Sequence, residues 1–193
     1  MDSDNTYIKQ IFKDLDFSEK EIQLINNAFK KVKFNKGAVL IEEGETVNTQ
    51  YFIMEGCLRS YRINKLGKEF TVQFGVKDWW ISDYTAFFSS EKAIMTVEVI
   101  QDAILYKITN EQKEFLYNQV PKIEHFFRLK LEKAFASFQK RIIANLSLTA
   151  AERYINFITT YPNIEQSVKN YHIASYLGIT TESLSRIRKE LAH

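Results

Sequence analysis

Apolar residues recur at helical spacing near the start of the chain. Ile22, Ile25 and Phe29 fall on one helix face, and Ser18 with Glu21 forms an S-x-x-E capping box where that helix begins. In such a box a hydroxyl and a carboxylate accept from backbone N–H groups that the helix end leaves without partners. The pattern predicts helices over about the first thirty residues.

From Val32 the pattern changes to short apolar runs separated by turn residues. The runs occupy residues 38–41, 51–54, 58–63, 70–74, 95–99 and 103–108. Gly44, Gly56 and Gly67 stand between or beside them, and tight corners in a sheet favour glycine. Short strands at this spacing predict an antiparallel β-roll or jelly roll.

A long uninterrupted helix is predicted after the roll. Asn110 is expected to cap a short helix that contains Phe115 and Leu116, and Pro121 suits the first position of the next helix. No breaker follows until about Asn145, which gives the second helix a length of about 36 Å at 1.5 Å per residue.

This long helix carries apolar residues on two faces. Spacings of four, three and four, the rhythm of a coiled-coil seam, separate Phe127, Leu131, Ala134 and Phe138. Off that seam lie residues that can pack on the helix's own protomer, namely Ile123, Phe126, Phe135, Ile142 and Ile143. The pattern favours a two-fold dimer through the seam over burial of both faces in one large core.

The C-terminal part has the pattern of a helix-turn-helix. Thr149 and Glu152 form a second capping box, and Pro162 ends the helix that they open. Two short helices then flank Gly178, which suits the left-handed backbone of a helix end. Thr180 is the expected N-cap of the second helix. In such a motif the second helix enters the DNA major groove, whereas an αα-corner without a DNA role shares the bare pattern.

The predicted recognition helix, residues 180–191, has an apolar stripe and a polar face. The residues expected at DNA are Thr180, Thr181, Glu182, Ser185, Arg186 and Lys189. Arg186 suits guanine O6 and N7, and Glu182 can accept from cytosine N4. The alternative role for Glu182 is that of a partner for the helix dipole. Lys140 and Arg141, late in the long helix, are expected to be the nearest cations for phosphate.

Composition narrows the classes of function. The 193 residues are 45% hydrophobic and 26% charged, which is ordinary globular material, and contain no apolar run long enough to span a bilayer. The net charge is only +2, so DNA binding requires a local basic surface. Met1 to Asn5 are acidic and polar, which argues against a signal peptide. The single Cys57 excludes an internal disulfide and fits a reducing cytoplasm.

No pattern in the chain indicates an enzyme, a metal site or a cofactor. A cupin-type enzyme needs histidine ligands in its roll, and the three histidines, His125, His172 and His193, all lie after it. There is no G-x-S-x-G, P-loop or Cys/His zinc spacing. Cys57 is expected to be a core residue rather than a nucleophile.

The run from Ala174 to Thr180, followed by Glu182 and Leu184-Ser185-Arg186, resembles the recognition motif of the Crp/Fnr family of bacterial transcription regulators. The roll carries turn residues that match the same family, namely Gly37, Glu43-Gly44-Glu45, Tyr51-Phe52-Ile53 and Gly56. The resemblance covers nearly the whole chain and implies a cytoplasmic homodimer that binds double-stranded DNA and no membrane. RNA polymerase and an unknown small-molecule effector are the further partners it implies. Many members of that family have a β-hairpin wing after the recognition helix; no full wing is expected here, which would remove a source of backbone contacts.

Cyclic-nucleotide-binding members of that family open a short helix with Gly-Glu and follow it with Arg-Ser/Thr-Ala, which hold the ribose and the cyclic phosphate. Ile81 and Ser82 are expected at the Gly-Glu positions here, and Lys92 is the nearest replacement for the arginine, without its planar fork. The candidate effector pocket comprises Trp79, Trp80, Ile81, Ser82 and Lys92. Neither cyclic AMP nor cyclic GMP is expected to bind there in the usual way, and one cysteine cannot ligate an iron–sulfur cluster.

These patterns combine into one expected organisation of the α+β class. Residues 1–120 form N-terminal helices and an antiparallel, jelly-roll-like β-roll sensor domain, residues 121–146 a dimerisation helix, and residues 147–193 an all-α helix-turn-helix domain that lacks a full wing. The expected function is transcription regulation by a dimer that reads a pseudo-palindromic site. The rival is a sensor or interaction protein that keeps the roll and the dimer helix and does not bind DNA.

Overall fold

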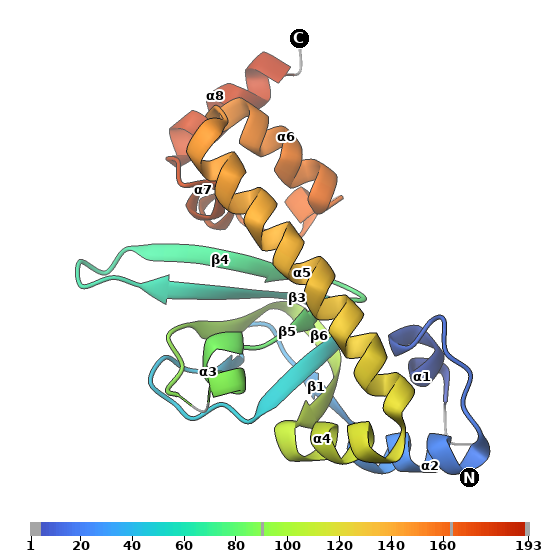
Figure 1. The fold of residues 1–193 in the computed structure, drawn as a ribbon. Coiled ribbons are helices and arrows are strands. Elements are labelled where there is room, and N and C mark those ends of the chain that lie inside the picture. Colours follow the sequence, from blue (N-terminus) through green and yellow to red (C-terminus); the bar gives the residue numbers. More distant parts are fainter. Residues whose placement is uncertain (1–4, 90, 163, 192–193) are drawn as a thin grey trace.

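A computed structural model describes residues 5–89, 91–162 and 164–191 (Figure 1). Met1 to Asp4, most of the stretch that argues against a signal peptide, and His193 lie outside these ranges. The helices are α1 (Thr6–Ile11), α2 (Glu19–Ala28), α3 (Tyr84–Ser89), α4 (Asn110–Gln119), α5 (Pro121–Ser147), α6 (Ala150–Thr160), α7 (Asn170–Leu177) and α8 (Thr181–Leu191), with a 3-10 turn η1 (Ile164–Gln166). The strands are β1 (Lys30–Phe34), β2 (Val39–Ile41), β3 (Thr49–Ile63), β4 (Glu69–Gly75), β5 (Trp80–Ile81) and β6 (Thr96–Thr109).

The strands form one antiparallel sheet that curls into a roll, as the sequence predicts. The main order is β1-β6-β3-β4, with β2 paired to β6 and β5 paired to β3. The two long central strands shift register around Glu55 and Cys57, and such bulges bend a sheet. Gly56 lies at this bend with φ +98°, where an added Cβ would stand 2.5 Å from the carbonyl oxygen of Asp102. Only glycine fits a corner that close.

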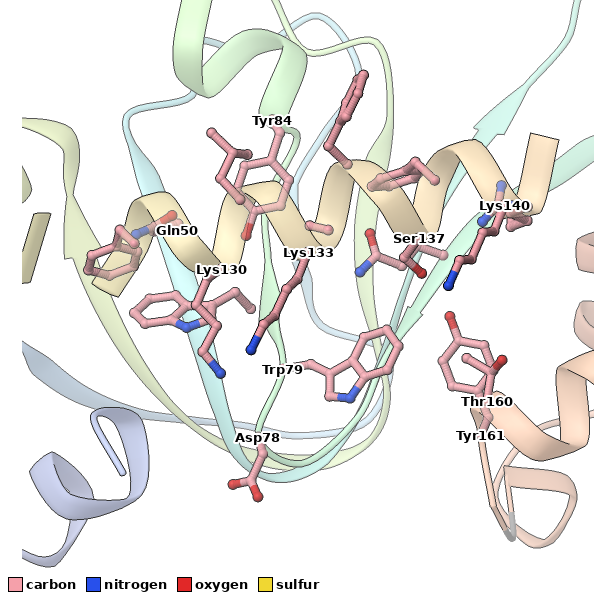
Figure 2. A pocket seen from close by; sticks show the side chains of 18 of the residues that line it. Gln50, Asp78, Trp79, Tyr84, Lys130, Lys133, Ser137, Lys140, Thr160 and Tyr161 are labelled. Carbon is pink, nitrogen blue, oxygen red and sulfur yellow. The ribbon is translucent and has the colours of Figure 1, made fainter. Parts of the chain in front are cut away.

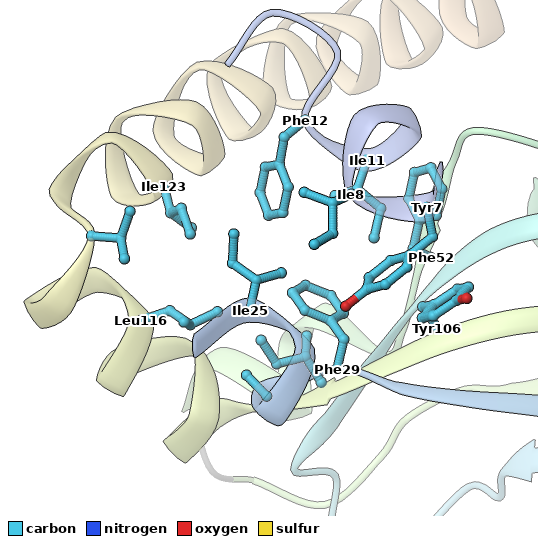
Figure 3. Close-up of a cluster of buried hydrophobic side chains, with 13 residues drawn as sticks. Tyr7, Ile8, Ile11, Phe12, Ile25, Phe29, Phe52, Tyr106, Leu116 and Ile123 are labelled. Atoms are coloured by element: carbon cyan, nitrogen blue, oxygen red, sulfur yellow. The ribbon is translucent and has the colours of Figure 1, made fainter. Parts of the chain in front are cut away.

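The N-terminal helices close one side of the roll (Figure 3). Phe12 is fully buried at the centre of this cluster and meets Phe126 of α5 with 5.0 Å between ring centroids. The predicted capping box opens α2, with the Ser18 backbone N–H 2.7 Å from Glu21 Oε2. At α4 the cap is Thr109, which accepts from the Gln112 backbone N–H at 3.2 Å, so the prediction of Asn110 is wrong by one residue.

A second cluster joins the roll to the C-terminal helices. Phe74 of β4 is fully buried there, and its ring centroid lies 5.5 Å from that of Tyr176, 5.8 Å from Tyr161 and 6.0 Å from Phe157. Because the three partners belong to α6, its C-terminal cap and α7, the helix-turn-helix unit is packed on the β3–β4 hairpin (Figure 1).

The long helix α5 begins at Pro121, as predicted, and runs past the mouth of the roll to the C-terminal helices (Figure 1). Phe127, expected in a seam between protomers, instead packs in its own protomer, with its ring centroid 5.0 Å from that of Trp80. Conversely, Phe135, Ile142 and Ile143 are not packed on their own protomer, because they are 64, 58 and 62% exposed. The other residues of the two predicted stripes that the structure separates lie as expected: Leu131 and Phe138 are exposed, and Ile123 and Phe126 pack in their own protomer.

Within the described ranges, no helix combines the length and the apolarity needed to cross a membrane.

Candidate nucleic-acid interface and effector cleft

The turn between α7 and α8 is built as the sequence predicts. Gly178 ends α7 in the left-handed conformation, with φ 68° and ψ 31°. Thr180 then accepts from the Ser183 backbone N–H, with 3.2 Å between Oγ1 and N, and so caps the start of α8. These two residues fix the direction in which α8 leaves the turn.

The helix α8 has a buried face and an exposed polar face. Leu184 and Ile187 are buried against α6 and α7. The predicted contact residues Thr180, Glu182, Ser185, Arg186 and Lys189 are exposed, and Thr181 is half-buried. The structure therefore brings all six to the free side of one short segment. Arg186 is held only by a surface pair, with 3.9 Å between its Nε and Glu190 Oε1, which leaves its guanidinium available.

Glu182 sits in the first turn of α8, where donors converge. Its own backbone N–H and the hydroxyls of Thr180 and Thr181 hold the pKa of its carboxyl below the usual range. The carboxylate is therefore ionised at neutral pH, which suits both acceptance from a base and the helix-dipole role.

Sequence reasoning missed Arg188, which holds α8 in place. Its guanidinium donates to Asn170 Oδ1 at 2.7 Å, to Glu165 Oε1 at 2.5 Å and to the Tyr154 hydroxyl at 3.2 Å. One side chain thus ties α8 to α6, η1 and α7. The available signal was its position one residue after the buried Ile187, which turns it away from the face of Arg186.

The helix-turn-helix unit is also hydrogen-bonded to the roll. The Ser175 hydroxyl of α7 donates to the Glu69 carbonyl at 2.8 Å and accepts from the Thr71 backbone N–H at 2.9 Å. Arg141 of α5 donates to the Val72 carbonyl and lies over the Tyr176 ring, 4.9 Å from its centroid. Arg141 is therefore a bridge from α5 to β4, and its expected role at phosphate is not supported.

An ion-pair network lies in the roll near α7. The buried Arg59 contacts Glu69 Oε2 at 2.6 Å and Glu98 Oε2 at 3.0 Å, and its guanidinium lies 3.9 Å from the ring centroid of Tyr61. Burial, together with the charge of Arg59, lowers the pKa of His172 to about 4. His172 is therefore neutral at physiological pH and acts as a packing residue of α7.

A cleft of about 1120 Å³ lies between α5, the roll and the C-terminal helices. Figure 2 shows Gln50 and Tyr84 toward one end and Thr160 and Tyr161 at the other, with Trp79 between them. Trp79 also packs on Tyr161, with 5.2 Å between ring centroids, so one wall of the cleft touches the helix-turn-helix unit.

Of the expected effector residues, the structure brings only the two tryptophans to this cleft. Trp79 and Trp80 line it, whereas Ile81 is fully buried in the roll interior. Ser82 is buried and donates to the Thr49 carbonyl at 2.8 Å. Lys92 is exposed and donates to Thr46 Oγ1 at 2.9 Å.

The pair that opens α3 is Ser82–Asp83, so the predicted placement of Ile81 and Ser82 at that position is wrong by one residue. Asp83 is fully buried. One of its carboxylate oxygens accepts from the Thr85 and Ala86 backbone N–H groups, at 3.0 and 3.3 Å. The other oxygen accepts from the backbone N–H groups of Ile94 and Met95, at 2.7 and 2.9 Å. This carboxylate therefore clamps the helix start to the loop before β6.

Over the ranges that the structure covers, no group of three or more His, Cys, Asp or Glu side chains is arranged to hold a metal ion. Burial raises the pKa of the Cys57 thiol to about 12, which makes it unreactive as a nucleophile at neutral pH.

Comparisons with known proteins agree with this architecture. A model of the cyclic nucleotide-binding domain matches residues 31–119. The regulatory protein HlyX of Actinobacillus pleuropneumoniae is 22% identical over 200 residues, which cover 95% of this chain and 80% of that protein. An anaerobic regulatory protein of Haemophilus influenzae is 23% identical over 194 residues, with 93 and 74% covered. These relatives are regulatory proteins rather than enzymes.

Solved structures share the fold at low sequence identity. FixK2 from Bradyrhizobium japonicum superposes with a TM-score of 0.73 at 17% identity, covering 85% of this chain and 84% of that one. The c-di-GMP-responsive global regulator CLP from Xanthomonas campestris gives a TM-score of 0.71 at 13% identity, covering 91 and 92%.

The Arg188 tie predicts a difference in stability between two neighbouring arginines. Arg188→Ala should lower the free energy of unfolding by about 2–4 kcal/mol, because three acceptors lose a partly buried charged donor. Arg186→Ala, on the exposed face of the same helix, should change it by less than about 0.5 kcal/mol. Urea denaturation followed by circular dichroism measures both, and equal effects would show that Arg188 does not hold α8.

Proposed function

Because the chain belongs to the Crp/Fnr family of transcription regulators, we propose that it acts as a dimer that reads a pseudo-palindromic DNA site with α8. The observation that carries this proposal is the exposed polar face of α8, fixed by the caps at Gly178 and Thr180. In this arrangement residues 1–120 sense, residues 121–146 dimerise and residues 147–193 bind DNA.

The proposed base contacts come from the first two turns of α8. Arg186 donates to guanine O6 and N7 as a fork, and Glu182 accepts from cytosine N4. Thr180, Thr181 and Ser185 supply hydroxyls to bases or backbone, and Lys189 contacts phosphate as a point charge. Because the net charge of the chain is only +2, the electrostatic attraction to DNA has to come from this local cluster and from the same cluster of the second protomer.

The proposed dimer forms through α5. Leu131, Phe135, Phe138 and Ile142 recur at spacings of four, three and four and are all exposed in the single chain. Exposed apolar residues in a continuous stripe of this length are typical of an interface. Phe127 drops out of the predicted seam because it packs in its own protomer. Leu131, Phe135 and Phe138 border the cleft as well, as does Ala134.

The roll is proposed not to bind cyclic AMP or cyclic GMP in the family's usual way. The N–H groups of Ile94 and Met95 already donate to the Asp83 carboxylate, so a cyclic phosphate would lose these donors. The arginine that would pair with the phosphate also has no counterpart, since Lys92 is exposed and donates to Thr46 Oγ1 at 2.9 Å, and a buried phosphate without a paired cation is costly.

DNA binding is tested by fluorescence anisotropy on duplexes enriched from a random pool, at two salt concentrations. Arg186→Ala should cost about 1–3 kcal/mol per half-site and relax the preference at one base pair. Lys189→Ala should weaken all sequences alike and reduce the salt slope by about 1. The control is Lys9→Ala in α1, at the far end of the molecule (Figure 1).

Two results would count against this proposal. Unchanged affinity and base preference in Arg186→Ala would mean that α8 does not read bases. Absence of salt-dependent DNA binding by the unmodified chain would favour the rival class, a sensor that signals through protein contacts.

The dimer is tested by sedimentation of three variants. Leu131→Asp should give a folded monomer, because a carboxylate replaces an apolar contact at the centre of the seam. Ala136→Asp puts the same carboxylate at an exposed position on a different face of α5 and should leave the dimer intact. Phe127→Asp should unfold the chain instead, since Phe127 packs on Trp80. A Leu131→Asp dimer of unchanged affinity would place the interface elsewhere.

Isothermal titration with cyclic AMP and cyclic GMP tests the negative proposal. The roll lacks the family's phosphate-binding arginine, and Asp83 occupies the backbone N–H groups of Ile94 and Met95. The dissociation constant should therefore be about 1 mM or higher. A dissociation constant below about 10 μM would show that Asp83 gives up its donors to a phosphate.

A further inference from the structure

A buried ammonium group lies in one wall of the cleft. Lys113, in α4, is only 5% exposed and lines the cleft. Its Nζ lies 4.5 Å from the ring centroid of Phe87, 5.1 Å from that of Phe88, 5.7 Å from Tyr117 and 5.8 Å from Phe127. Among the described residues, no oxygen accepts a hydrogen bond from it and no carboxylate pairs with it.

Aromatic faces alone are a poor environment for an ammonium group that is largely shielded from water. A cation over a ring gains about 0.5–2 kcal/mol, whereas a buried charge without a hydrogen-bond acceptor loses more than that. Burial lowers the pKa of Lys113 to about 8, and the charge of the neighbouring Glu114 opposes part of this shift. At neutral pH the group is still mostly charged, so this wall of the cleft presents a cation that lacks an acceptor.

Two further buried donors on the same part of the cleft lack acceptors. Gln50, 3% exposed, and Trp80 both line the cleft, and neither the Gln50 Nε2 nor the Trp80 Nε1 has a hydrogen-bond partner in the described part of the chain. They belong to one wall, because Gln50 and Phe52 project from the same side of β3 and Phe52 packs on Trp80, with 5.3 Å between ring centroids. Trp80 and Lys113 both contact the Phe127 ring.

We propose that this end of the cleft binds a small organic acid, with its carboxylate on the Lys113 ammonium and an aromatic body among the surrounding rings. A carboxylate has two acceptor oxygens and one negative charge, which match one ammonium and neighbouring neutral N–H donors. Trp80, Tyr84 and Phe88 supply flat apolar surface for the body of the ligand.

The charges around the site favour a monoanion over a phosphate. Glu114 and Glu124 line the same cleft, as does Asp78. The other cations of its lining are exposed or half-buried rather than buried, namely Arg128, Lys130, Lys133, Lys140, Arg141 and Arg153. A dianionic group would bring a second charge without a second buried cation to pair it. This site is separate from the Asp83 clamp, where the family's cyclic phosphate would bind. The inference rests on the proposed function and assigns its effector to the class of small organic acids.

The test is calorimetric titration of the full-length chain with benzoate, phenylacetate and indole-3-acetate, and with phenylacetamide as the neutral counterpart. At least one acid should bind with a dissociation constant below about 1 mM, and phenylacetamide should bind at least about tenfold more weakly than phenylacetate. Lys113→Met should weaken acid binding at least about tenfold, while Lys92→Met, an exposed lysine of the same roll, should leave it within about twofold.

Thermal unfolding of each variant accompanies the titration. Lys113→Met should be at least as stable as the unmodified chain, because it removes an unpaired buried charge, so that loss of binding cannot be ascribed to loss of the fold. Lys113→Gln is the second neutral variant, to be used if the methionine variant does not fold. No acid bound at about 10 mM, equal binding of phenylacetamide, or unchanged binding by the neutral Lys113 variants would each overturn the proposal. No DNA is present, so the outcome is independent of whether α8 reads bases.

Discussion

The position of α8 depends on the packing of one side chain, Phe74, against three aromatic rings of the C-terminal helices. Phe74 lies in β4, so its place is set by pairing with β3, and it contacts Phe157, Tyr161 and Tyr176. Buried aromatic pairs add about 0.5–1.5 kcal/mol each beyond the area that they bury. In the proposed dimer, two copies of α8 can match two half-sites only if their separation is fixed, and this cluster holds α8 relative to its own roll.

The helix α5 carries more apolar surface than its own protomer buries. Its first turns are part of the N-terminal core through Ile123 and Phe126, and Arg141 near its end anchors it to β4. Between these points it borders an open cleft and exposes an apolar stripe, of which Leu131, Phe135 and Phe138 line the rim of that cleft. An ordinary amphipathic helix has one apolar face, which its own core covers. Because α5 has a second apolar face that its own core does not cover, we expect a second protomer to cover it.

The sequence predicts the elements of this fold better than it predicts which side each residue faces. The capping boxes, the roll, Gly178 and Thr180 depend on local chemistry and are found where expected. Phe127 is wrongly assigned to the seam because two sets of residues on α5 follow the same spacing of four, three and four. One set begins at Phe127 and the other at Leu131, and the two differ only by a small rotation about the helix axis. The pair that opens α3 is predicted at Ile81 and Ser82, one residue too early, because a six-residue helix has too little periodicity to locate its start. Lys113 has no local signature, and Arg188 has only its position next to the buried Ile187, because the partners of both residues are distant in the sequence.

Lys113 is the residue whose presence the fold alone does not explain. A shift of its pKa from 10.5 to about 8 corresponds to a destabilisation on the order of 3 kcal/mol at neutral pH, which is a large share of the stability of a typical domain. Residues that oppose stability in this way are characteristic of functional sites. A ligand that supplies the missing acceptor binds only the folded state and so offsets this loss.

The far wall of the same cleft carries Tyr161 and Tyr176, the residues that hold the helix-turn-helix unit on Phe74. A ligand with different affinities for two arrangements of these walls shifts the population between them, and it does so by no more than that difference in affinity. If the proposed acid binds differently to two such arrangements, the rings shared by the cleft and the Phe74 cluster would link its binding to the position of α8.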